Sequence, residues 1–161
     1  MALTFSVLDG ALHDRDSFTC GVAALDNYLR QRAGQHHRDG IATTHVLIDD
    51  AQLNRILGYC TLSAAQLYLQ ELREEDRKRL PAYPVPAIRV GRLAVSQSEK
   101  SKGYGQLLLG HAVNLALSVR QTMGVRVLVV DAKDAQVAAY YEGFGFHRSV
   151  SAALTLYLPL G

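Results

Sequence analysis

The stretch Ser98-Glu99-Lys100-Ser101-Lys102-Gly103-Tyr104-Gly105-Gln106 lies between a predicted strand and a predicted helix. Residues 88–95 before it form a largely apolar strand pattern, and apolar residues recur at helical spacing after it, up to Val119. Two glycines let the backbone approach a ligand, and the first amides of a helix attract anions. Lys100 and Lys102 add positive charge. The stretch therefore predicts either a phosphate-binding loop or an ordinary surface loop.

The segments that follow this helix predict a parallel sheet. Residues 125–130 form a continuous apolar run, which is typical of a strand buried on both faces. A short helix is predicted over 135–142, ended by Gly143, and a last strand over 154–158. Strand, helix and strand in succession imply at least one pair of parallel strands joined by a crossover helix.

The first half of the chain predicts a helix followed by a hairpin. Apolar residues at helical spacing and alternating β-branched residues indicate these elements. Prolines at 81, 84 and 86 predict an extended connector before the central strand. The elements expected before that connector are a helix from 22 to 33, a polar loop over 34–40, strands over 43–49 and 55–62 with a turn at 49–52, and a charged helix over 69–80.

Composition bounds the class of protein. The 161 residues are 48% hydrophobic and 20% charged, so we expect a single domain over residues 1–161. No apolar run is long enough for a membrane span, and the first residues lack the pattern of a secretion signal, so a cytoplasmic protein without membrane contact is expected. Cys20 and Cys60 lack the spacing of a disulfide framework or a zinc site, so no metal is expected. A net charge of +2 is too small to indicate a nucleic-acid partner by itself.

Two motifs together resemble those of a known family. The first is Lys100-x-x-Gly103-x-Gly105, which resembles the pyrophosphate motif of the GNAT family of N-acetyltransferases. The second resembles the family's C-terminal motif and reads Tyr140-Tyr141-Glu142-Gly143-Phe144-Gly145-Phe146. Lysine replaces the usual Gln or Arg at position 100, and Ser101 stands where many members carry glycine. The resemblance implies an α+β (mixed α/β) fold. Its twisted mixed sheet has about six to seven strands, flanking helices and a splayed V between strands 4 and 5.

The similarity extends over nearly the whole chain and is closer to one branch of the family, the acetyltransferase toxins of toxin–antitoxin modules. The resemblance to this branch implies an enzyme that acetylates the α-amine of aminoacyl-tRNA, which stops translation. It implies acetyl-CoA as cosubstrate, aminoacyl-tRNA as substrate, a ribbon–helix–helix antitoxin as partner, and a homodimer as an option. The segments that carry this resemblance are Phe18-x-Cys20-Gly21, Leu25-Asp26-x-Tyr28-Leu29, 58–63, Gly91-Arg92-Leu93-Ala94-Val95 and 129–134.

The resemblance implies the following site residues. Tyr141 falls at the general-acid position, because a phenol is protonated at neutral pH and can donate to a departing thiolate. Outside the motif the same tyrosine reads as a core aromatic. Amides of Leu93 and Val95 would hold the pantetheine arm and polarise the thioester oxygen. The other implied contacts to acetyl-CoA are Lys100, Ser101, Lys102, Gly103, Tyr104, Gly105, Gln106 and Asp134, and the arginines and lysine expected to meet tRNA are Arg89, Arg92, Arg77 and Lys78.

No general base is evident in the sequence. His45, His111 and His147 are single histidines without a visible carboxylate partner, and Glu142 suits a structural role. An α-amine has a pKa near ~8 and needs little help to lose its proton, whereas a lysine amine near ~10.4 needs a base. The absence favours a low-pKa amine such as that of aminoacyl-tRNA, although a water relay would also serve.

Two other functions stay open at this point. One is an acetyltransferase for small-molecule or protein amines, which predicts an acidic groove, and the sequence has no concentrated acidic run. The other is a non-catalytic module that binds acyl-CoA, which would keep the loop at 100–105 but lose the acid. The presence of Tyr141 counts against the second.

Overall fold

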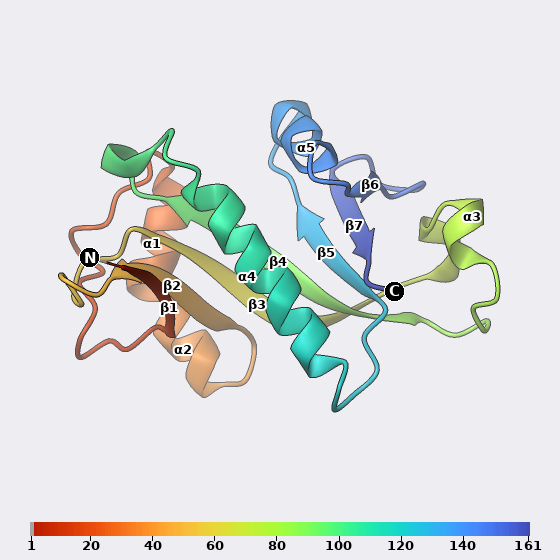
Figure 1. Cartoon of the computed structure of the whole chain (residues 1–161), viewed down its shortest axis with the longest axis horizontal. Helices are drawn as coiled ribbons and strands as arrows, with labels where there is room; N and C mark the ends of the chain where they lie inside the picture. Colours follow the sequence, from red (N-terminus) through yellow and green to blue (C-terminus); the bar gives the residue numbers. More distant parts are fainter. Residues whose placement is uncertain (1) are drawn as a thin grey trace. The chain divides into compact units, whose positions relative to one another are not determined.

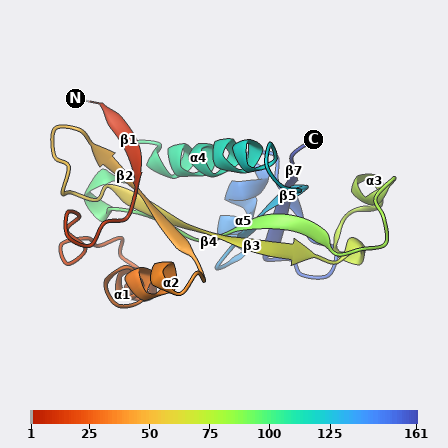
Figure 2. The same cartoon turned by 90° about the horizontal axis from the view of Figure 1, so that it is seen from below.

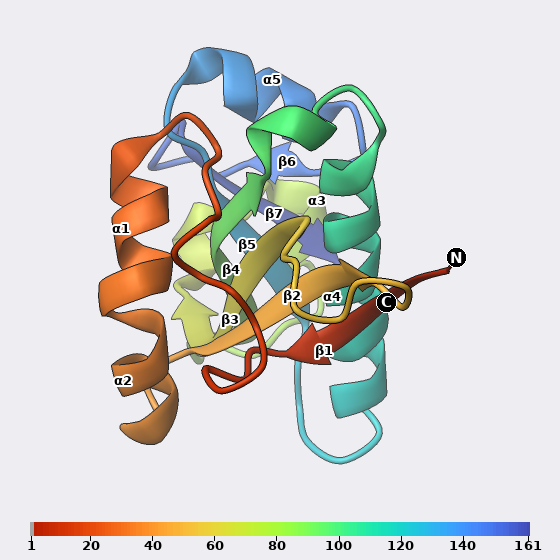
Figure 3. The same cartoon turned by 90° about the vertical axis from the view of Figure 1, so that its left-hand side faces the viewer.

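The N-terminal strands form an antiparallel meander in the computed structural model, which describes residues 2–161. β1 (Leu3–Val7), β2 (Thr43–Asp49) and β3 (Gly58–Leu67) are neighbours in that order (Figure 3). The register places His45 opposite Val7 on one side and Cys60 on the other. The expected hairpin is therefore confirmed, with β2 at the predicted residues.

The complete strand order is β1-β2-β3-β4-β5-β7-β6. β4 (Val85–Val95) and β5 (Val127–Asp131) run parallel and are separated in sequence by α4 (Tyr104–Val119), so the predicted crossover helix is confirmed (Figure 1). β7 (Thr155–Pro159) is antiparallel to both β5 and β6 (His147–Arg148). This is the mixed seven-stranded sheet that the resemblance implied, whereas the splayed V stays a prediction.

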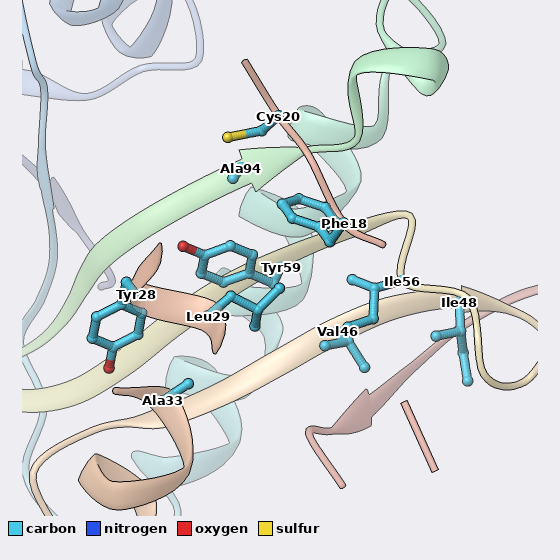
Figure 4. Close-up of a cluster of buried hydrophobic side chains, with 10 residues drawn as sticks. All are labelled: Phe18, Cys20, Tyr28, Leu29, Ala33, Val46, Ile48, Ile56, Tyr59 and Ala94. Atoms are coloured by element: carbon cyan, nitrogen blue, oxygen red, sulfur yellow. The ribbon is translucent and has the colours of Figure 1, made fainter. Parts of the chain in front are cut away.

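Contacts divide the chain into two compact units, of which the first comprises Met1–Ser63 and Gly91–Ala112. In this unit α1 (Ala23–Gln31) and α2 (Ala33–Arg38) cover one face of the strands, and the first half of α4 covers the other (Figure 2). The core beneath α1 contains Tyr59, which is fully buried and donates its hydroxyl hydrogen to the Leu25 carbonyl at 2.6 Å. Figure 4 shows this ring among the side chains of α1, β2 and β4.

The second unit comprises Ala64–Val90 and Val113–Gly161. Its sheet pairs 87–90 of β4 with 127–130 of β5, and all four of these β5 residues are buried. The prediction of a strand buried on both faces is therefore confirmed. α5 (Ala135–Glu142) has the predicted bounds and ends at its C-cap, Gly143. A single domain over residues 1–161 stays a prediction.

The prediction of a charged helix over 69–80 is wrong. The structure has a short 3-10 turn, η1 (Leu69–Glu71), and a single α-helical turn, α3 (Glu74–Arg77). Between them Leu72 is extended, with ψ at 150°, and its side chain is buried. The Tyr157 hydroxyl accepts from the Arg73 amide at 2.9 Å and donates to Asp76 at 2.6 Å. These tertiary contacts override the local helical pattern.

Other boundaries shift for similar reasons. Residues 34–38, expected in a polar loop, continue as α2. The second hairpin strand begins three residues later than predicted and extends to Leu67. β1 and the two-residue β6 were not predicted, because both depend on pairing with a partner strand. No helix in residues 2–161 has the length and apolar character of a membrane span.

Candidate active site

The loop between β4 and α4 has a backbone conformation that depends on two residues with positive φ. After a short 3-10 turn, η2 (Gln97–Glu99), the chain is extended at Lys100 and then left-handed at Ser101, with φ at 71°. Gly103 has φ at 79°, and a Cβ built there would meet no atom within 4 Å. Glycine at 103 thus answers a conformational need, and Ser101 occupies a conformation that glycine adopts with less strain.

The N-terminus of α4 provides donors for an anion. The Leu107 amide makes a helical hydrogen bond to the Gly103 carbonyl at 3.2 Å, and the amides just before it have no acceptor within the helix. The dipole of this 16-residue helix favours negative charge at the same end. These residues therefore fit the pyrophosphate of a coenzyme, with Lys100 exposed beside them.

The charge of Lys102 is engaged differently from the expectation. Its Nζ lies 2.5 Å from Oε2 of Glu99, and Oε1 of that carboxylate lies 2.7 Å from Nη2 of Arg55. The hydrogen bond from Lys102 and the Arg55 guanidinium hold the pKa of Glu99 below its usual range, and the same bond raises the pKa of Lys102. The ammonium of Lys102 therefore neutralises a carboxylate within the protein.

The strand residues Leu93 and Val95 are half-buried at the end of β4. Ala94 between them belongs to the core beneath α1, so strand alternation turns Leu93 and Val95 toward the opposite face. Their role in binding acetyl-CoA stays a prediction.

Tyr141 lies in the second unit, on α5. Its side chain is 5% exposed and contacts the rings of Tyr140 and Phe146, at centroid distances of 5.7 and 5.9 Å. Tyr140 is 44% exposed, in agreement with its different direction along the helix. Asp134, one of the residues expected at acetyl-CoA, caps α5 by accepting from the Val137 amide at 2.9 Å. The acid role of Tyr141 and the cofactor role of Asp134 both stay predictions.

The cationic residues expected to meet tRNA have different surroundings. In the first unit, Cζ of Arg92 lies 3.6 Å from the ring centroid of Tyr28. The two line a groove of about 350 Å³ together with residues of α1 and Arg32. In the second unit, Arg89 forms an ion pair with Asp131. Arg77 and Lys78 are exposed at the end of α3.

Sequence reasoning missed two features of the first unit. His45 and His111, taken as single histidines, share a hydrogen bond of 3.0 Å between Nδ1 and Nε2, and Phe5 stacks on His111. Glu99 and Arg55 were assigned no role. The three-residue spacing of Glu99 and Lys102 indicates an ion pair when both residues lie on a helix, and here Lys102 lies in the loop before α4. In residues 2–161 no group of three His, Cys, Asp or Glu side chains is arranged to hold a metal ion.

Glu142, expected to be structural, forms an ion pair with Arg148 at 3.0 Å. An assignment of Glu142 as the base for an amine therefore gains no support from its surroundings, because the carboxylate is already engaged by a guanidinium.

Comparison with known proteins agrees with this architecture. The model of the acetyltransferase (GNAT) family matches residues 11–146. A tRNA-acetylating toxin of Mycobacterium tuberculosis is 32% identical over 145 residues, which cover 90% of this chain and 85% of that protein. A structure of AtaT complexed with acetyl-methionyl-tRNAfMet is 28% identical, with a TM-score of 0.91 over 98% of this chain and 95% of that one.

A second solved structure is a tyrosine-to-phenylalanine variant of AtaT bound to acetyl-CoA and the C-terminus of the antitoxin AtaR. It is 28% identical, with a TM-score of 0.83 over 98% of this chain and 93% of that one. The family model covers most of the chain, and the sheet order and the loop before α4 agree with it. This chain therefore belongs to the GNAT acetyltransferase family.

Proposed function

We propose that this protein transfers the acetyl group of acetyl-CoA to the α-amino group of aminoacyl-tRNA and thereby blocks translation as the toxin of a toxin–antitoxin pair. The observation that carries the proposal is similarity along almost the entire chain to a tRNA-acetylating toxin and to AtaT, whose structure was solved with acetyl-methionyl-tRNAfMet. The anion-binding start of α4 supports the cosubstrate.

The residues would divide the chemistry as follows. Acetyl-CoA would supply the thioester carbon as electrophile. The amides that begin α4 would hold its phosphates, and the amides of Leu93 and Val95 would hold the pantetheine arm and stabilise charge on the thioester oxygen. The amine nitrogen would form a bond to the thioester carbon as the carbon–sulfur bond breaks. Tyr141 would donate its phenolic proton to the departing thiolate and regain a proton, through water, from the nitrogen of the new amide.

The substrate amine arrives largely without its proton. An α-amine titrates near ~8, and the neighbouring ester lowers that value further, so a dedicated base is unnecessary. His45 and His111 are engaged with each other, and burial lowers the pKa of both, so their surroundings give no support for either as the base. A reaction without a dedicated base suits an α-amine better than the ε-amine of lysine.

The cationic groove supports an RNA substrate. Arg92 and Arg32 line it together, and guanidinium groups bind phosphate and stack on bases. In the second unit, we propose Arg77, Lys78 and Arg89 as separate contacts to RNA. We also propose that a ribbon–helix–helix antitoxin binds this protein, that the protein forms a homodimer, and that it acts in the cytoplasm.

The test uses purified protein, radiolabelled acetyl-CoA and a pool of charged tRNA. Acetylated aminoacyl ester is expected from the wild type, and Tyr141→Phe should lower the rate by about a hundredfold or more. Tyr140→Phe is the matched control, because it removes a neighbouring hydroxyl from the same helix, and it should retain activity. Label found only on small amines, or a Tyr141→Phe variant as fast as wild type, contradicts the proposal.

A further inference from the structure

A buried carboxylate lies at the base of the loop that precedes α4. Glu99 ends the 3-10 turn η2, and the residue is only 6% exposed. A buried charge is unfavourable unless it is paired, and Glu99 has two cationic partners. Arg55 contacts one carboxylate oxygen and Lys102 the other. The arrangement is thus a built ion-pair cluster within the first unit.

Arg55 connects this cluster to the turn between β2 and β3. Its Nη2 lies 2.7 Å from Glu99 and also donates to the Ser98 hydroxyl at 2.9 Å. Its own amide donates to the Gln52 carbonyl at 3.1 Å within the turn. The Arg55 guanidinium therefore connects the last two residues of η2, Ser98 and Glu99, to the turn between β2 and β3. Arg55 lies 44 residues before Glu99 in the sequence.

Lys102 closes the cluster on the other side. Glu99 and Lys102 flank Lys100 and Ser101, the segment in which the backbone changes from extended to left-handed. The ion pair joins the residues on either side of this change in backbone conformation. The chain then continues through Gly103 into α4. Breaking it frees the least favourable backbone conformation of the loop.

The negative charge of Glu99 allows two possible roles of this carboxylate to be distinguished. A carboxylate beside a pyrophosphate site repels the ligand, so electrostatics alone predicts tighter binding when Glu99 is neutralised. A carboxylate that fixes the loop predicts the opposite, because a disordered loop must be ordered again on binding. The two effects differ in direction and can be separated by measurement.

We propose that Glu99 is a positioning residue, which preorganises the loop at 100–105 for the pyrophosphate of coenzyme A by pairing with Arg55 and Lys102. The inference rests on the proposed function, because it assigns the pyrophosphate to this loop. Arg55 donates to Glu99 and Ser98, and it contacts the carboxylate oxygen that Lys102 does not contact.

Calorimetric titration with free coenzyme A tests this without any acceptor amine. Glu99→Gln, which keeps the shape of the side chain, should weaken binding by about tenfold, and Arg55→Gln should weaken it in the same direction. The double variant should lose little more than either single variant, since both remove one unit. Asp16→Asn, which removes an exposed carboxylate elsewhere in the unit, should bind as wild type does.

Pantetheine, which lacks the pyrophosphate, separates positioning from general damage. Both variants should bind it as the wild type does, whereas a misfolded protein would lose both ligands. Unchanged or tighter binding of coenzyme A by Glu99→Gln overturns the positioning role, whatever the effect of Arg55→Gln. Absence of coenzyme A binding by the wild type contradicts the proposed function instead, so the two failures are distinguishable.

Discussion

The guanidinium of Arg92 lies over the ring of Tyr28, with Cζ 3.6 Å from the ring centroid. The same tyrosine places its hydroxyl 2.9 Å from Nδ1 of His36, so α1 and α2 support the ring from behind. A cation held in this way keeps a defined position in the groove, because the aromatic face restricts it without neutralising its charge.

Replacing Arg92 should weaken RNA binding selectively. Arg92→Gln is expected to raise KM for charged tRNA by about tenfold and to flatten its dependence on salt, because one phosphate contact is removed. KM for acetyl-CoA should not change. Steady-state kinetics at several salt concentrations measure both effects. Arg15→Gln removes a positive charge of the same unit outside the groove, and an equal effect from that control would argue against a specific contact.

Because Ser101 has a left-handed backbone conformation, glycine and valine at this position should have different effects on the free energy of unfolding. Ser101→Gly should leave the free energy of unfolding unchanged or raise it by up to about 1 kcal/mol, because glycine adopts positive φ without steric strain. Ser101→Val should lower it by about 1–2 kcal/mol. Urea denaturation compares the three proteins, and a valine variant as stable as wild type would show that the loop changes conformation to accommodate it.

His45 should make stability depend on pH. Burial, aided by the charges of His111 and His37, lowers the pKa of His45 to about 4. In the unfolded chain the group titrates near ~6.5, so between these values the unfolded state binds the extra proton. Stability from this group is present above about pH 6.5 and is lost as the pH falls toward 4, by about 2 kcal/mol between pH 7 and 5.

Urea denaturation of the wild type and of His45→Gln at pH 7 and pH 5 isolates this contribution. The variant should lose less stability on acidification than the wild type, because other titrating groups are common to both. Equal losses in the two proteins would assign the acid sensitivity to other groups.

The hydroxyl of Tyr157 should contribute to the stability of the second unit. Tyr157→Phe removes one acceptor for the Arg73 amide and one donor to Asp76, and should lower the free energy of unfolding by about 1–3 kcal/mol. Tyr140→Phe removes a hydroxyl from an exposed tyrosine and should have little effect. Thermal and urea denaturation report the difference, and equal stability of both variants would show that solvent replaces the buried partners.

Local pattern alone determined much of the architecture. The bounds of β2 and α5 agree with the predicted residues, and α4 begins at Tyr104 as its glycines indicate. Each of these elements has a period or a cap that a short segment specifies by itself. The spacing of the Lys100–Gly105 and Tyr140–Phe146 motifs was likewise sufficient to indicate the family, which the comparisons show.

Contacts between distant residues decided the rest. The segment 69–80 has a helical pattern, yet its only α-helical turn is α3. The Arg73 amide, just before α3, donates instead to the hydroxyl of Tyr157, 84 residues later in the sequence. Nothing in the sequence marks Glu99 as buried, and the fold brings the guanidinium of Arg55, 44 residues away, to its carboxylate. A local pattern sets what a segment prefers, whereas burial and the pairing of charges depend on which distant side chains the fold brings to it.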